Sequence, residues 1–240
     1  MHNLRTLTVG AAALLAGATA FGSSLKEDVK RLDQSTLVLS EIRNAPDTGI
    51  PESVWGKAEC VVVIPSMKKA AFIVGGEWGS GVMSCRAGNH WTAPVFMSLA
   101  KGSAGFQIGG QETDLVLVVM NRTGVEKLLS NKVTLGTDAS IAAGPVGRMA
   151  SAATDVQLDA EMLSYSRTKG LFAGVDLSGG TLKADNDANA RMYGPNVTAS
   201  QIALGQVAVP MTVQARAFTH ALGTQYATPT TGTMPKTKKY

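Results

Sequence analysis

The sequence has few of the residues that usually carry catalysis or bind metals. Its 240 residues include two cysteines, three histidines and 5% aromatic residues. The cysteines and histidines do not recur at the spacings of zinc ligands, so we expect no metal site. No serine has glycine both two residues before and two residues after it, which excludes the nucleophile elbow of an α/β-hydrolase. These absences predict a protein that is not an enzyme and needs no cofactor.

A carboxylate-based active site is the remaining catalytic alternative. Asp155, Asp159 and Glu161 lie close together in the sequence. A solvated turn explains three acidic residues at this spacing better than a pair of catalytic carboxylates does. We therefore favour a role without catalysis.

An excess of one charge is also absent from the body of the chain. The sequence has 22 basic and 18 acidic residues, a formal net charge of +4. Four of the basic residues are Arg5 and three lysines in the last five residues, and without them the basic residues equal the acidic ones in number. Nucleic-acid binding needs a basic patch built into the fold. We therefore expect no nucleic-acid partner.

Long hydrophobic runs are absent except for one short run near the start, residues 9–21. It follows Arg5 and contains Ala18-Thr19-Ala20, so residues 1–20 are predicted to be a cleaved signal peptide, with an uncleaved tether as the alternative. The run is shorter than the roughly 20 residues of a membrane span. Because residue 18 is alanine rather than cysteine, a lipoprotein anchor is not possible there.

Export changes the interpretation of the two cysteines. In an oxidising compartment, an isolated pair forms a disulfide more often than a metal site. We therefore expect a disulfide between Cys60 and Cys85.

Glycine, in contrast, is abundant, with 26 residues, which favours turns and closely packed strands over long helices. A capping box at Ser24 and apolar residues at helical spacing predict a helix over 25–42. Further helices are expected over 51–58, 123–129, 185–193, 198–205 and 212–222. Strands are expected over 60–64, 71–74, 81–86, 95–99, 104–108 and 115–120, as a meander, and over 140–143, 152–157, 162–166 and 171–177. The glycine-rich segment 75–81 is expected to be a hairpin turn.

These elements predict an α+β fold. We expect a curved antiparallel β-sheet or open barrel, with an N-terminal amphipathic helix and several short C-terminal helices. Residues 21–226 are expected to form a single domain. Residues 227–240, rich in Thr, Pro, Gly and Lys, are expected to be a disordered tail.

Motifs in the middle of the chain resemble those of the SYLF-domain family of lipid-binding proteins. In unbroken order over residues 45–180 they include Gly49-Ile50-Pro51, Val63-Ile64-Pro65-Ser66, Gly105-Phe106-Gln107-Ile108-Gly109, Gly144-Pro145-Val146-Gly147-Arg148 and Gly170-Leu171-Phe172-Ala173-Gly174. The Gly-Pro-x-Gly-Arg stretch and the paired cysteines look most like the exported bacterial branch. The resemblance implies non-catalytic binding of an anionic phospholipid or membrane surface, in the periplasm or at the outer membrane. The alternative is an envelope interaction protein that binds an unidentified protein partner.

Two segments are candidates for lipid contact. On the predicted N-terminal helix they are Leu25, Lys26, Val29, Lys30, Arg31 and Leu32. The apolar stripe of this helix is about 80° wide and its charges cancel, so packing against the sheet is an equal alternative. The second candidate is the pair Lys68 and Lys69, expected in a turn where two ammonium groups could meet lipid phosphates; the alternative there is a solvated turn.

Overall fold

The computed structural model describes residues 9–45, 49–71, 74–104, 111–130, 132–147, 159–168 and 171–223. The helices are α1 (Val9–Arg43), α2 (Glu52–Lys57), α3 (Arg122–Leu128), α5 (Asn186–Tyr193), α6 (Ala199–Ala203) and α7 (Val213–Ala221). The strands are β1 (Cys60–Ala71), β2 (Val74–Ala87), β3 (His90–Trp91), β4 (Val95–Ala104), β5 (Gln111–Val119), β6 (Val133–Thr134), β7 (Ile141–Ala143), β8 (Met162–Thr168), β9 (Leu171–Gly174) and β10 (Thr181–Ala184). The strand expected over 152–157 and the tail 227–240 lie outside the described residues, as does 104–108 beyond its first residue.

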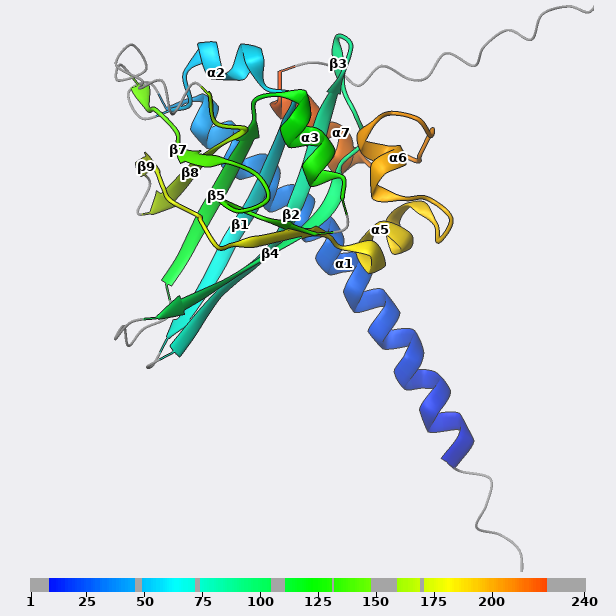
Figure 1. Ribbon diagram of the computed structural model, residues 1–240. Coiled ribbons are helices and arrows are strands. Elements are labelled where there is room, and N and C mark those ends of the chain that lie inside the picture. The colour runs from blue at the N-terminus through cyan, green and yellow to red at the C-terminus, as the bar shows by residue number, and fades with distance from the viewer. Residues whose placement is uncertain are drawn as a thin grey trace, which may run out of the picture.

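The strands form one strongly curled sheet, a half-barrel, with helices around it (Figure 1). The predicted α+β fold, with an N-terminal helix and several C-terminal helices, is therefore confirmed. The strand order is β6-β10-β4-β2-β1-β5-β8-β7, with β3 beside β2 and β9 beside β8. The pairs are antiparallel apart from β7 and β8, which run parallel, so the sheet is mixed rather than purely antiparallel. The segment between these two strands is long enough for the crossover that a parallel pair needs.

The expected meander is wrong. β1, β2 and β4 are neighbours in sequence order, but β5 returns to the free edge of β1 instead of pairing with β4. Three consecutive strands followed by a fourth beside the first form a Greek key. Local spacing of strands could not distinguish these topologies, because both have the same sequence of short strands and turns.

The core lies on both faces of the central strands. α1 runs behind the sheet in Figure 1 and packs against β1, β2, α5 and α7. Residues 61–64 of β1 and 115–119 of β5 are all buried, whichever face their side chains occupy. This explains why both segments are continuous apolar runs rather than alternating ones.

A β-bulge interrupts β1 between Val63 and Lys68, where the register with both neighbouring strands shifts. Ser66 in the bulge has a φ of 48°, a left-handed conformation that residues other than glycine rarely adopt. The Ser66 backbone N–H donates to Asp114 Oδ1 at 2.9 Å, which holds the bulge against β5. A Cβ atom at Gly81 would overlap the Val63 carbonyl oxygen, so β2 needs glycine opposite the bulge. The glycine-rich segment 75–81 therefore lies within a strand, not in the expected turn.

Candidate functional site

Lys68 and Lys69 lie in strand β1, not in a turn. The strand continues to Ala71, so the sequence analysis ended it too early. Adjacent residues of a strand point to opposite faces of the sheet. The structure therefore separates this pair of lysines into two different environments.

Lys68 lies on the face of the sheet that we call the α1 face. Its partners across the neighbouring strands are Trp78 of β2 and Glu112 of β5. Asp114 and Arg167 share this face, and Arg167 forms an ion pair with Glu41 of α1. Lys68 and Glu112 are exposed, and the Trp78 side chain is 49% exposed. An exposed indole thus stands next to an exposed ammonium group; we call Lys68 and Trp78 the hairpin end.

Lys69 lies on the opposite face, which we call the cavity face. Its ammonium group is 3.1 Å from the Glu77 carboxylate, and Glu77 is paired in register with Lys101 of β4. These three side chains line a cavity of about 360 Å³ at this end of the half-barrel, which we call the lysine cavity. The hydroxyl-bearing residues Thr113 and Ser166 also line it.

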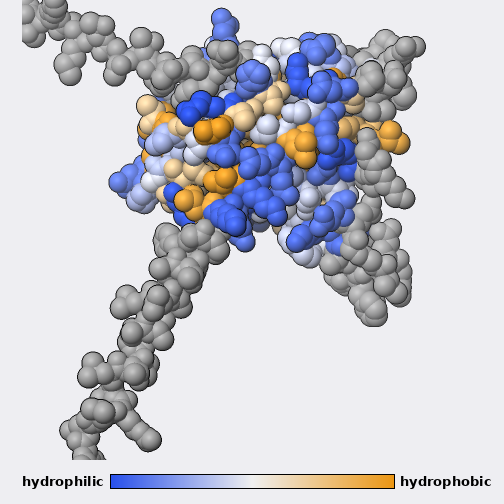
Figure 2. Space-filling view, turned by 180° about the vertical axis from the view of Figure 1, so that it is seen from behind, coloured by the Kyte–Doolittle hydropathy of each residue, from blue (hydrophilic) through white to orange (hydrophobic). Residues whose placement is uncertain are grey.

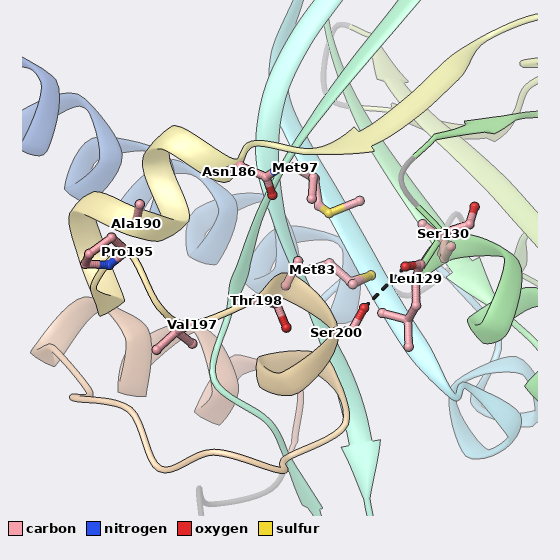
Figure 3. A pocket seen from close by; sticks show the side chains of 13 residues that line it. Met83, Met97, Leu129, Ser130, Asn186, Ala190, Pro195, Val197, Thr198 and Ser200 are labelled. Carbon is pink, nitrogen blue, oxygen red and sulfur yellow. Dashed lines mark hydrogen bonds between the residues drawn. The ribbon is translucent and has the colours of Figure 1, made fainter.

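A second cavity, of about 250 Å³, lies on the same face and has an apolar floor. Met83 of β2 and Met97 of β4 are both buried there, below residues of α3, α5 and α6 (Figure 3). Ser200 Oγ donates to the Leu129 carbonyl oxygen at 3.3 Å across one side of it. This methionine cavity could hold a small apolar group, since thioether side chains adapt to irregular shapes.

The candidate residues on α1 do not share one environment. Leu32 is fully buried in the core, Val29 is half-buried and Arg31 Nη1 is 2.7 Å from Asp185 Oδ2 of α5. Leu25, Lys26 and Lys30 are exposed. Only these last three therefore face outward on the structure described.

The buried face of α1 includes a charged residue that the apolar spacing did not predict. Asp28 is fully buried, and its carboxylate accepts hydrogen bonds from Arg191 of α5 at 2.8 and 3.2 Å. This contact raises the pKa of the Arg191 guanidinium. Asp28 lies at helical spacing from Leu32, Ser35 and Leu39, which are buried too. A search for periodicity among apolar residues alone could not find it.

On the face that carries α1, the residues that Figure 2 colours form no single large apolar area. Seen from behind, hydrophilic residues predominate and hydrophobic ones are scattered among them (Figure 2). No helix within the described residues combines the length and apolar character that crossing a membrane requires.

The disulfide between Cys60 and Cys85 is present. The two residues face each other in the register of β1 and β2, with their Cα atoms 3.9 Å apart. Both are buried. The bridge therefore joins the two strands at the end opposite to the hairpin end.

Of the three acidic residues considered for catalysis, Asp159 and Glu161 lie among the described residues, whereas Asp155 lies outside them. Asp159 is exposed. Although burial opposes ionisation of Glu161, hydrogen bonds from Lys127 and Ser140 lower its pKa. The Lys127 ammonium lies 2.6 Å from its Oε1, so Glu161 fastens α3 to the start of β8. The residues that the structure describes contain no cluster of three His, Cys, Asp or Glu side chains able to hold a metal ion.

Comparison with known proteins identifies relatives over much of the chain. An SH3 domain-containing protein of Schizosaccharomyces pombe is 37% identical over 78% of this chain and 45% of its own length. The rat SH3 domain-containing YSC84-like protein 1 is 33% identical over 78% of this chain and 56% of its own. The LAS seventeen-binding protein 3 of Saccharomyces cerevisiae is 35% identical over 70% of this chain and 37% of its own. The chain thus spans about half, or less, of the length of these relatives.

A family model gives the same assignment. The model for Ysc84, described as a Las17-binding protein actin regulator, matches residues 100–225, just over half of the chain. This range extends from β4 to beyond α7 and includes part of the lining of both cavities. The resemblance found in residues 45–180 overlaps it through β5, β8 and β9. The chain therefore belongs to the Ysc84 family, whose domain is the SYLF domain.

Proposed function

We propose that this protein is a non-catalytic phospholipid-binding protein of the bacterial cell envelope, and that the hairpin end is its membrane contact. The observation that carries the proposal is the exposed Trp78 indole beside the exposed Lys68 ammonium. A tryptophan suits the headgroup region of a bilayer because its ring is apolar and its N–H is polar. A neighbouring lysine adds attraction to anionic headgroups.

The two side chains contribute unequally. A cation near an anionic surface is worth about 1 kcal/mol, and Glu112 on the other side of Lys68 offsets part of that attraction. The indole is not subject to this offset, because its contribution comes from apolar burial. We therefore assign most of the affinity to Trp78 and a smaller, salt-sensitive part to Lys68.

Two features support the location in the envelope. Residues 9–21 have the apolar character of a signal-peptide core, and Ala18-Thr19-Ala20 offers a cleavage site. The Cys60–Cys85 disulfide suits an oxidising compartment such as the periplasm. Sequencing the N-terminus of the protein recovered from cell envelopes tests the location: mature protein starting near residue 21 supports it, and recovery only in the cytosol contradicts it.

The test of lipid binding uses substitutions rather than removal of α1. Truncation of residues 21–45 would delete Leu32, Leu39 and Ile42 from the core and unfold the protein. We would instead compare flotation of the wild-type protein and Trp78→Ala with vesicles of phosphatidylglycerol and phosphatidylethanolamine. The matched control is Val213→Ala, since Val213 is 70% exposed on α7, away from the hairpin end.

Wild-type protein and Val213→Ala should float with these vesicles, and Trp78→Ala should bind about tenfold less tightly. The loss should persist at high salt, because the contribution of the indole is apolar. Equal flotation of Trp78→Ala and the wild-type protein would contradict the hairpin end as the contact. Absence of flotation by the wild-type protein would contradict phospholipid binding altogether.

Binding to a protein partner is the second candidate function. The name of the yeast relative and the description of the family both refer to binding of Las17, a protein. If this protein binds a protein partner, it would be recovered from envelope extracts in a stoichiometric complex with that partner and would not float with protein-free vesicles. The flotation experiment therefore distinguishes the two candidates.

A further inference from the structure

We propose that the lysine cavity binds a singly charged phosphodiester that carries hydroxyl groups, such as a glycerol phosphodiester headgroup. The cavity is distinct from the hairpin end, although both lie at the same level of β1 and β2. If the source of this group is a lipid, the inference deepens the proposed function; if the source is a soluble diester, it is independent of membrane binding.

Charged side chains from three strands converge on the cavity. Lys69 of β1, Glu77 of β2 and Lys101 of β4 are successive partners across three neighbouring strands. Residues paired in this way have side chains on the same face of the sheet. The half-barrel curls around that face, so all three side chains line one cavity of about 360 Å³. This volume lies within the range of about 300–1,000 Å³ that is usual for small-molecule sites.

The two lysines of the cavity differ in how they are paired. Lys69 is bound to Glu77 at 3.1 Å, and the Glu77 side chain is only 15% exposed. Lys101 Nζ donates to the backbone carbonyl of Asp176 at 3.1 Å, and within the described residues it has no carboxylate within 4 Å. The carboxylate of Asp176 instead accepts hydrogen bonds from Ser178 Oγ and N–H, which lower its pKa. Asp176 also lines the cavity, and its ionised carboxylate offsets the charge of Lys101 without touching the Lys101 ammonium group. That ammonium group therefore has no bound carboxylate among the described residues, and a phosphodiester oxygen can contact it.

The rest of the cavity lining offers hydroxyl groups and apolar surface. Thr113 and Ser166 supply hydroxyl groups that can donate or accept hydrogen bonds. The Glu77 carboxylate can accept a hydrogen bond from a ligand hydroxyl, while Met67 and Leu115 provide apolar surface. Hydroxyl and carboxylate groups beside the ammonium groups suit a polyol attached to the phosphate. A ligand without hydroxyl groups would leave these polar side chains unpaired.

Calorimetric titration of the full folded chain with two probes tests the proposal. One probe is glycerophosphoglycerol, a soluble diester, and the other is dihexanoyl phosphatidylglycerol below its micelle concentration. The variants are Lys101→Ala, Lys69→Ala and Glu77→Gln. Lys183→Ala is the matched control, because Lys183 is exposed on β10 and pairs with Ser98 of β4, so it lies on the face of the sheet opposite to Lys101.

We expect Lys101→Ala to weaken binding at least tenfold and Lys69→Ala several-fold, while Lys183→Ala leaves it unchanged. Glu77→Gln should strengthen binding several-fold, because it releases Lys69 from its ion pair. A purely structural role for these residues would not produce tighter binding on removal of a carboxylate. Thermal unfolding of each variant confirms that it is folded before titration.

The outcomes distinguish a lipid from a soluble diester as the source of the ligand. They also distinguish binding in the lysine cavity from membrane contact at the hairpin end. Binding of both probes with this pattern supports the cavity as a site for the diester itself. Binding of dihexanoyl phosphatidylglycerol alone, with the same pattern, supports a lipid headgroup as the source. If neither probe binds to the wild-type protein at concentrations of about 10 mM, or if Lys183→Ala weakens binding as much as Lys101→Ala, the proposal is overturned. None of these results depends on Trp78→Ala, which tests membrane contact separately.

Discussion

The two ends of the β1–β2 hairpin differ in what covers them. At the end that carries Cys60 and Cys85, both faces of the sheet are buried, and the strand is a continuous run of apolar residues. At the other end the covering stops, and adjacent residues such as Lys68 and Lys69 differ in environment according to the face they occupy. The same two strands thus provide the stability of the fold at one end and the candidate binding groups at the other. The bulge at Ser66 marks the boundary between them.

The largest effect is expected from a substitution at the bulge, which is the boundary between the two ends of the hairpin. Gly81→Ala places a Cβ atom against the Val63 backbone, which cannot move without disturbing the bulge. We expect a loss of about 4 kcal/mol in the free energy of unfolding, or failure to fold. Gly76→Ala is the matched control, since its nearest neighbouring atom would be 3.8 Å away. Urea unfolding of both variants measures the difference, and equal stability would contradict the close approach at the bulge.

The next prediction concerns the helix that covers the end of the hairpin that carries Cys60 and Cys85, which we call the closed end. It compares two leucines of α1 that were both candidates for lipid contact. Leu32 is fully buried, whereas Leu25 is 44% exposed. Leu32→Ala should lower the free energy of unfolding by about 3 kcal/mol, because it leaves a cavity in the core. Leu25→Ala should change it by less than about 0.5 kcal/mol. A similar small effect for both variants, measured by urea unfolding, would show that α1 is not docked on the sheet.

The disulfide provides another test of the difference between the two ends of the β1–β2 hairpin, because it lies at the closed end. Replacing both Cys60 and Cys85 by alanine should cost about 3 kcal/mol, since the bridge closes a loop with a sequence separation of 25. Thermal unfolding of this variant beside the wild-type protein measures the cost. Because the bridge lies away from the hairpin end, vesicle binding at a temperature where the variant is folded should not change. Two thiols that alkylate freely in the native protein would contradict the bridge.

Several parts of the fold could be predicted from the sequence because their causes are local. The helix over 25–42 follows from apolar residues at helical spacing, and the structure includes it in α1. The predicted start was wrong, because α1 begins at Val9 and Ser24 lies within the helix instead of capping it. The strand starts at Cys60 and Val95 follow from β-branched and apolar residues next to turn signals. The helices near 185–193 and 198–205 are capped by Asp185 and Thr198, as their side chains suggest.

Other parts could not be predicted because their causes are tertiary. The return of β5 to β1 depends on the curl of the whole sheet, which leaves no local pattern. β1 continues past Ile64 because β2 and β5 pair with it, although Pro65 and Ser66 resemble a strand end. The lysine cavity could not be predicted because Lys69 and Lys101 are far apart in the sequence. These residues meet only through the register of β1, β2 and β4.

The smallest expected effect compares lysines from the two ends of the hairpin region. Lys68 stands beside the exposed Trp78, whereas Lys57 is exposed on α2, close to the closed end. At low salt, Lys68→Ala should weaken binding to phosphatidylglycerol vesicles about fivefold, the equivalent of about 1 kcal/mol for one cation near an anionic surface. Lys57→Ala should leave binding unchanged if that end of the molecule faces away from the membrane. The effect of Lys68→Ala should fade at 1 M salt, where the screening length is about 3 Å, while the contribution of Trp78 persists. Equal losses for the two lysines in a flotation assay would indicate a diffuse electrostatic attraction rather than a defined contact. Equal losses would not bear on the lysine cavity, because soluble diesters test it separately. The two faces of β1 can therefore be assigned separate roles.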